Sequence, residues 1–152
     1  MKVHILFQPA TSPTGGGNQF LRTLDNIFTL NMVRADCVAD ADVVLFNSHH
    51  FMLQVATEKR RFPKKIFVHR IDGPMRLYNA RTDKRDYIVN TAAATISDGT
   101  IFQSEWSRSE NYRLGLYKNT SDTVIYNAVD PDIFNKNQTH RHELVTKSKK
   151  GL

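Results

Sequence analysis

The chain of 152 residues has one cysteine, Cys37, and no extended apolar run near its N-terminus. A single thiol cannot form an internal disulfide, and one thiolate is too few for a cysteine zinc site. The first segment, MKVHILFQPA, is apolar only over a short stretch that His4 and Gln8 interrupt. This pattern is too short for a signal peptide or a membrane span. We therefore expect a cytoplasmic protein in a reducing compartment.

Acidic residues are outnumbered, with 15 Asp and Glu against 21 Lys and Arg, which gives a formal net charge of +6. The excess is concentrated in EKRRFPKK (Glu58–Lys65) and KSKK (Lys147–Lys150). Such a balance favours anionic partners, among them phosphate groups and an acidic membrane surface at which the protein could bind peripherally. Nucleic acid is not expected, because the sequence has no RNP-like stacking motif, basic helix or zinc motif.

Two nucleotide-binding signatures are absent from the glycine-rich segment TSPTGGGNQFLRTL (Thr11–Leu24). Phe20 stands where the third glycine of G-x-G-x-x-G is required, and no Gly-Lys-Ser/Thr follows. An NAD-dependent dehydrogenase and a P-loop nucleotidase are therefore disfavoured. The glycine triplet is then either a plain surface turn or a bare backbone that approaches a phosphate at a helix N-terminus.

Strand and helix patterns alternate along most of the chain. Apolar residues at three- and four-residue spacing predict a helix after the glycines, and Gly99 has the position of a C-terminal helix glycine. Buried strands are predicted at Lys2–Pro9, Ala39–Ser48, Lys64–Gly73, 99–104 and Ser121–Val129, and further helices at His50–Arg61, Tyr87–Ser97 and 105–117. This order predicts an α/β fold, a Rossmann-like three-layer sandwich with a mostly parallel sheet. The 152 residues suit one domain of ordinary size.

Five separated segments together resemble the N-terminal domain of GT-B glycosyltransferases, specifically the large retaining family 4. They are TSPTGGGNQFLRTL, ADVVLFNS, KKIFVHRIDG, TIFQSEWSRSENYRLG and VIYNAVDPDIF. The last resembles the Asn-Gly-Val-Asp segment with which that family leaves its first domain, although Ala128 replaces the glycine. The resemblance covers residues 1–134, and the polar, basic residues 135–152 look like the start of an interdomain linker.

This resemblance implies a retaining hexosyltransferase that moves a sugar from a nucleotide diphosphate sugar to a glycan or lipid-linked acceptor. It implies no metal cofactor. The family binds its donor mainly through a C-terminal domain that residues 135–152 do not supply. We therefore expect this chain to be the acceptor-side half and to be inactive alone. The rival hypothesis is a non-catalytic α/β module that binds phosphate-bearing or other anionic partners.

The resemblance also assigns candidate site residues. The glycine loop approaches donor phosphates or acceptor through Gly15, Gly16, Gly17 and Asn18, and the catalytic strand-end position falls on His69 or Asp72. Strand alternation places His69 on one face and Arg70 and Asp72 on the other, so the two are not interchangeable. Arg70 could meet an anionic acceptor, and Ser104 is either a ligand contact or only a helix cap. The interdomain hinge falls at Asn127 and Asp130.

The adjacent histidines His49 and His50 raise the question of a metal site. We expect their side chains to point apart, and no carboxylate lies at ligand spacing. His140 and His142 lie in a polar tail. No metal site is expected.

Overall fold

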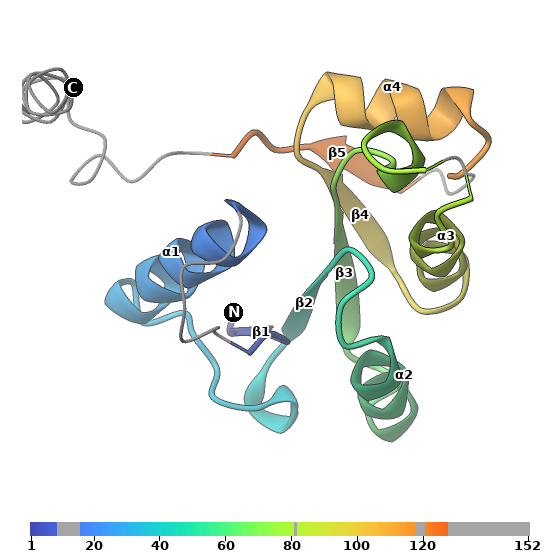
Figure 1. Cartoon of the computed structure of the whole chain (residues 1–152). Coiled ribbons are helices and arrows are strands. Elements are labelled where there is room, and N and C mark those ends of the chain that lie inside the picture. The colour runs from blue at the N-terminus through green and yellow to red at the C-terminus, as the bar shows by residue number, and fades with distance from the viewer. Residues whose placement is uncertain (9–15, 81, 118–120, 128–152) are drawn as a thin grey trace, which may run out of the picture.

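Five parallel strands form one sheet in the computed structural model, which describes residues 1–8, 16–80, 82–117 and 121–127 (Figure 1). Neighbouring strands follow the chain order: β1 (Val3–Ile5), β2 (Val43–Asn47), β3 (Ile66–Ile71), β4 (Gly99–Phe102) and β5 (Asp122–Val124). The helices are α1 (Gly16–Leu30), α2 (Met52–Arg61), α3 (Arg85–Thr95) and α4 (Glu105–Arg113). The predicted α/β class with a Rossmann-like, three-layer arrangement is confirmed.

The sheet has a topological switch between β1 and β2. After α1, the chain passes the outer side of β1, where Val3 N–H donates to Val33 O (2.7 Å) and Ala35 N–H donates to Val3 O (2.8 Å). It then returns across β1 and enters β2 on the inner side. The connection after β1 therefore runs away from the other strands, whereas the connections after β2, β3 and β4 run toward β5. This reversal explains why α1 covers one face of the sheet while α2 and α3 cover the other (Figure 1).

Two apolar layers hold the helices to the sheet. On the α1 face, Leu21 packs with Val3, Ile5 and Leu45, and Phe20, Leu24 and Phe28 pack around them. On the opposite face the core is built from consecutive strands and from α2 and α3: Val44, Phe46, Phe67, Val55 and Ala92, with a second cluster around Ile71, Phe102, Val89 and Ala93. The strand β2 alternates between these two layers, which confirms that it is covered on both faces.

Several predicted boundaries differ from the observed ones. The first strand is only Val3–Ile5, and the last is Asp122–Val124. Gly99 does not end a helix: α3 ends at Thr95, and Gly99 opens β4. The helix closes earlier because the N–H groups of Ile96 and Ser97 both donate to Ala92 O. By contrast, Gly115 has the left-handed φ of 64° just after α4, as expected of a helix-ending glycine.

No helix within the described ranges is both long enough and apolar enough to cross a bilayer. The predicted linker at residues 135–152, and with it Asp130 and Gly15, lies outside the described residues.

Candidate functional site

The carboxyl ends of β1 and β2 flank the topological switch, which is where open parallel sheets bind their ligands. α1 begins at this edge with Gly16, and its next residue, Gly17, lies over the end of β2. A Cβ built on Gly17 would be 3.9 Å from Asn47 Nδ2, an ordinary contact, so this glycine is not required for space. Asn18 is in the first turn of the same helix. The structure thus brings Gly16, Gly17 and Asn18 to the carboxyl edge of the sheet.

Arg70 is the centre of a polar cluster at this edge. Its side chain is 3% exposed and lies on the α1 face, with its guanidinium 4.4 Å from the centre of the Phe20 ring. Its Nη1 donates to Asn47 Oδ1 (2.6 Å) and to Asp72 Oδ1 (2.8 Å), and its Nη2 donates to Gln103 Oε1 and Asn127 Oδ1 (both 3.0 Å). Residues at or just beyond the ends of four strands, β2 to β5, therefore share one cation.

Asp72 is the solvent-facing carboxylate of this cluster. Its side chain is 25% exposed, and only its Oδ1 accepts from Arg70. Its Oδ2 has no hydrogen-bond partner within the described part of the chain. A carboxylate held on one oxygen and open on the other can accept hydrogen bonds from hydroxyl groups. Asp72 can therefore contact a ligand at this edge, whereas the Arg70 guanidinium is largely engaged.

His69 faces the other side of the sheet, the apolar layer under α2 and α3. It is fully buried, its ring stacks on Phe46 at 4.3 Å, and its Nε2 lies 2.8 Å from Ser48 O, which can only accept. Burial lowers its pKa to about 4, only partly offset by that hydrogen bond, so the ring is neutral at pH 7. The expected alternation of His69 and Arg70 between faces is confirmed. Of the two candidates for the catalytic position, only Asp72 reaches solvent.

Backbone strain marks the loop that follows β2. Ser48 and Phe51 both have left-handed φ angles, 50° and 55°, although neither is glycine. Such conformations are uncommon for non-glycine residues and concentrate at functional sites. Between them lie His49 and His50, whose rings are 4.2 Å apart, so the expectation that they point apart is wrong. The left-handed residues on either side turn the backbone so that the two rings meet.

His49 is the titratable group that this loop brings toward the cluster. Burial lowers its pKa first, and the charges of His50 and Arg85 lower it further, while Asp83 and Asp72 act in the opposite direction. The histidine is half-buried and close enough to Asp72 to sense its charge. From the sequence alone, His49 is a candidate only for metal binding. No group of three or more metal-ligating side chains occurs among the described residues.

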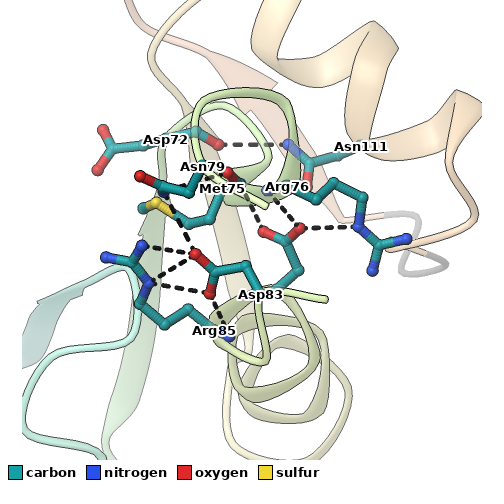
Figure 2. A network of polar contacts seen from close by, with 8 residues as sticks. Asp72, Met75, Arg76, Asn79, Asp83, Arg85 and Asn111 are labelled. Carbon is teal, nitrogen blue, oxygen red and sulfur yellow. Dashed lines mark hydrogen bonds and ion pairs between the residues drawn. The ribbon is translucent and has the colours of Figure 1, made fainter. Parts of the chain in front are cut away.

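Two carboxylates, of which Asp86 is buried, fix the loop after β3. Asp86 of α3 is 4% exposed and accepts from the N–H groups of Met75 (2.6 Å) and Arg76 (3.1 Å) and from Arg76 Nε (2.9 Å). Asn79 bridges Met75 O and Asp83 Oδ2, which extends the network to Arg85 (Figure 2). These contacts hold the short 3-10 helix Met75–Leu77 against α3, so the loop beside Asp72 has a defined conformation.

Two remaining candidates have structural roles at the edge. Ser104 caps α4, because its Oγ accepts from Ser107 N–H at 3.1 Å. Asn127 accepts from Arg70 and donates to Gln103 Oε1 (3.0 Å), which fixes the chain just beyond β5. The residue is therefore anchored to the cluster at the point where the interdomain hinge was predicted.

The basic segment Glu58–Lys65 lies at the other edge of the sheet, before β3 begins. Lys59 pairs with Asp98 at 2.6 Å, and Lys65 Nζ donates to the carbonyls of Ala39 and Ala41. Arg61 pairs with Glu58 within α2. Much of this charge is thus engaged in holding α2 and the strand ends together, and it is remote from the candidate site.

Fold and edge geometry together define a parallel α/β domain with a polar cluster at its topological switch. No family model, no curated protein and no solved structure matches this chain.

Proposed function

We propose that this chain is the acceptor-side half of a retaining glycosyltransferase that uses a nucleotide diphosphate sugar. The resemblance of its five segments to family 4 motivates the reaction class. The observation that carries the proposal is the convergence of the α1 N-terminus, the Arg70 cluster and the open carboxylate of Asp72 at the switch between β1 and β2. This is the edge at which such sheets bind ligands.

In this proposal each group has a distinct task. The first N–H groups of α1, from Gly16 onward, favour the negative charge of a leaving diphosphate. Asp72 accepts hydrogen bonds from acceptor hydroxyls, and Arg70 holds Asp72 and the strand ends in place. Burial lowers the pKa of His49, so its half-buried imidazole is a neutral base beside Asp72. His69 contributes by packing and keeps the end of β2 in register.

Binding and turnover test the proposal separately. We expect UDP-glucose, UDP-N-acetylglucosamine or GDP-mannose to bind the full chain weakly, as measured by saturation-transfer NMR. Gly16→Val should weaken that binding because a branched side chain crowds the first turn of α1, while thermal unfolding stays unchanged. Binding of none of the three would contradict the proposal. Steady sugar transfer by the purified chain alone would contradict the assignment to an acceptor-side half.

The rival function, a module for anionic partners, has one observation in its favour. Arg60 and Lys64 are exposed at the amino edge, beside the engaged charges of the same segment. A charge-driven module would bind inorganic pyrophosphate as tightly as a nucleotide sugar and would lose binding steeply with salt. Replacing both residues by glutamine should leave nucleotide sugar binding unchanged under our proposal and abolish anion binding under the rival one.

A further inference from the structure

Two large aromatic rings lie exposed beside the candidate site. Tyr78 follows the loop after β3 and is 60% exposed, and Trp106 lies in the first turn of α4 and is 48% exposed. Their ring centres are 5.9 Å apart in an edge-to-face arrangement. Trp106 is the only tryptophan of the chain. Exposed apolar surface that is contiguous can mark a ligand-binding site.

The rings rest directly on the backbone of Gly73. A Cβ at this position would collide with Trp106 Cζ3 and with the Tyr78 hydroxyl, and would lie 3.1 Å from Trp106 Cη2. The φ angle of Gly73 is not positive, so its backbone conformation does not require glycine. Glycine is required here because the two rings approach the backbone closely. The absence of a side chain lets both rings lie against Gly73, the residue that follows Asp72.

Both rings are attached to rigid elements. The backbone of the 3-10 helix before Tyr78 is bonded to Asp86, as described above, and Tyr78 N–H donates to Met75 O (3.0 Å). The helix that carries Trp106 is bound to the end of β3 through Asn111 Nδ2, which donates to Asp72 O (3.3 Å). The rings are thus positioned in advance, which lowers the entropic cost of binding a ligand on them.

A negative charge lies beside this aromatic surface. Asp72 directly precedes Gly73, and in Figure 2 its carboxylate is turned away from the polar network that holds the loop. Burial and then the charge of Asp72 raise the pKa of the Tyr78 hydroxyl, as expected if the two groups are close. The surface therefore combines two ring faces with an open carboxylate oxygen and a phenol.

We propose that Tyr78, Trp106 and Asp72 form a binding platform for a pyranose ring of the acceptor. A pyranose presents C–H groups on its faces and hydroxyls around its rim, so it can pack on an aromatic ring while its hydroxyls donate to a carboxylate. A β-D-glucopyranoside suits this surface because its axial positions carry only hydrogen. The assignment of this sugar as acceptor rests on the proposed function, whereas sugar binding itself does not.

The emission of Trp106 reports on the platform directly. Methyl β-D-glucopyranoside added to the full chain should change this emission saturably, and the probe is not a donor. Tyr78→Ala should weaken binding by about tenfold, because one packing surface is lost, whereas Tyr78→Phe should retain most of it. Asp72→Asn should also weaken binding by about tenfold, since the charged acceptor is lost.

Two further variants guard against misfolding and unspecific effects. Tyr87→Ala removes a tyrosine that is still more exposed, 71% on α3, and should leave sugar affinity unchanged. Gly73→Ala keeps every functional group but displaces both rings, so it should weaken binding at least as much as Tyr78→Ala. Circular dichroism of each variant verifies the fold.

The outcomes separate this platform from the proposed function. No saturable change with the glucoside, or equal affinities for Tyr78→Ala and Tyr87→Ala, would overturn the platform even if nucleotide sugars bind. A change caused by uridine but not by the glucoside would also overturn it and would indicate base stacking. Glucoside binding that requires Tyr78 would support the platform, and if nucleotide sugars failed to bind, the transferase assignment alone would fall.

Discussion

Consecutive residues of β3 lie in opposite environments. His69 is enclosed by the apolar layer under α2 and α3, stacked on Phe46, and held neutral. Arg70 lies on the α1 face, where four side-chain oxygens from other strand ends and from Asp72 surround its guanidinium. One face of the strand thus contributes packing, while the other organises the polar edge. The difference shows that a strand-end histidine is no better a site candidate than its neighbours until its face is known.

Removing the guanidinium of Arg70 should disrupt the polar cluster and destabilise the fold. Arg70→Met keeps much of the side-chain volume but leaves Asn47, Asp72, Gln103 and Asn127 without their shared donor. We expect a loss of about 4 kcal/mol in unfolding free energy, measured by urea denaturation. The exposed Arg60→Met should change stability by less than about 0.5 kcal/mol. Equal stabilities for the two variants would mean that the cluster does not hold the strand ends together.

Acidification should instead remove the stability that the neutral ring of His69 contributes on the apolar face. Because the pKa of His69 is lowered from 6.5 to about 4 in the folded chain, the unfolded chain binds a proton first as pH falls. Stability from the neutral ring is therefore complete above pH 6.5 and is lost progressively toward pH 4, by about 3 kcal/mol. His69→Phe keeps the stacked ring but cannot titrate. Parallel pH profiles of both proteins between about pH 7 and about pH 4.5 would refute this account.

The loop beside the polar face should depend on Asp86. Asp86→Ala leaves the N–H groups of Met75 and Arg76 without their acceptor, and we expect a loss of about 2 kcal/mol. Trp106 emission should change as well, because the adjacent Tyr78 loop loosens. Asp36→Ala, at an exposed residue, is the matched control and should cost less than about 0.5 kcal/mol. Unaltered emission in a destabilised Asp86→Ala would show that the loop does not position Tyr78.

Ser104 gives the smallest expected effect and separates a cap from a ligand contact. Ser104→Ala should lower stability by about 1 kcal/mol, because Ser107 N–H loses its acceptor. Ser104→Asn should restore most of that stability, since asparagine is an equally good cap. Thermal unfolding measures both. A variant that binds glucoside less well although asparagine has restored the cap would instead identify Ser104 as a ligand contact.

Local patterns in the sequence were sufficient for much of the fold. Apolar runs located the strands, and alternation placed His69 and Arg70 on opposite faces, because both properties depend on neighbouring residues. The switch between β1 and β2 was not identified, since it depends on Val33 and Ala35 passing along the outer side of β1. The helix end near Gly99 was wrong for a related reason: the last turn of α3 closes on Ala92 before that glycine.

The candidate site was only partly predictable. Arg70 and Asp72 belong to one motif, whereas the rings that approach them, Tyr78 and Trp106, are 28 residues apart and meet only through Gly73. The position of His49 near the cluster was not predictable, because Ser48 and Phe51, the left-handed residues on either side of the two histidines, are not glycines. The signal that the sequence offers for the platform is Gly73, just beyond the end of a strand, with Tyr78 a few residues later.

The central claim is that ligands bind at the carboxyl edge of the sheet. A titration of the ¹⁵N-labelled full chain with methyl β-D-glucopyranoside tests it most directly, because each backbone amide reports its own perturbation. We predict shifts confined to residues 47–51, 72–79 and 104–107, with none at Lys59, Lys65 or Asp98 on the amino edge. Perturbations at the amino edge, or none at all at saturating sugar, would contradict the account.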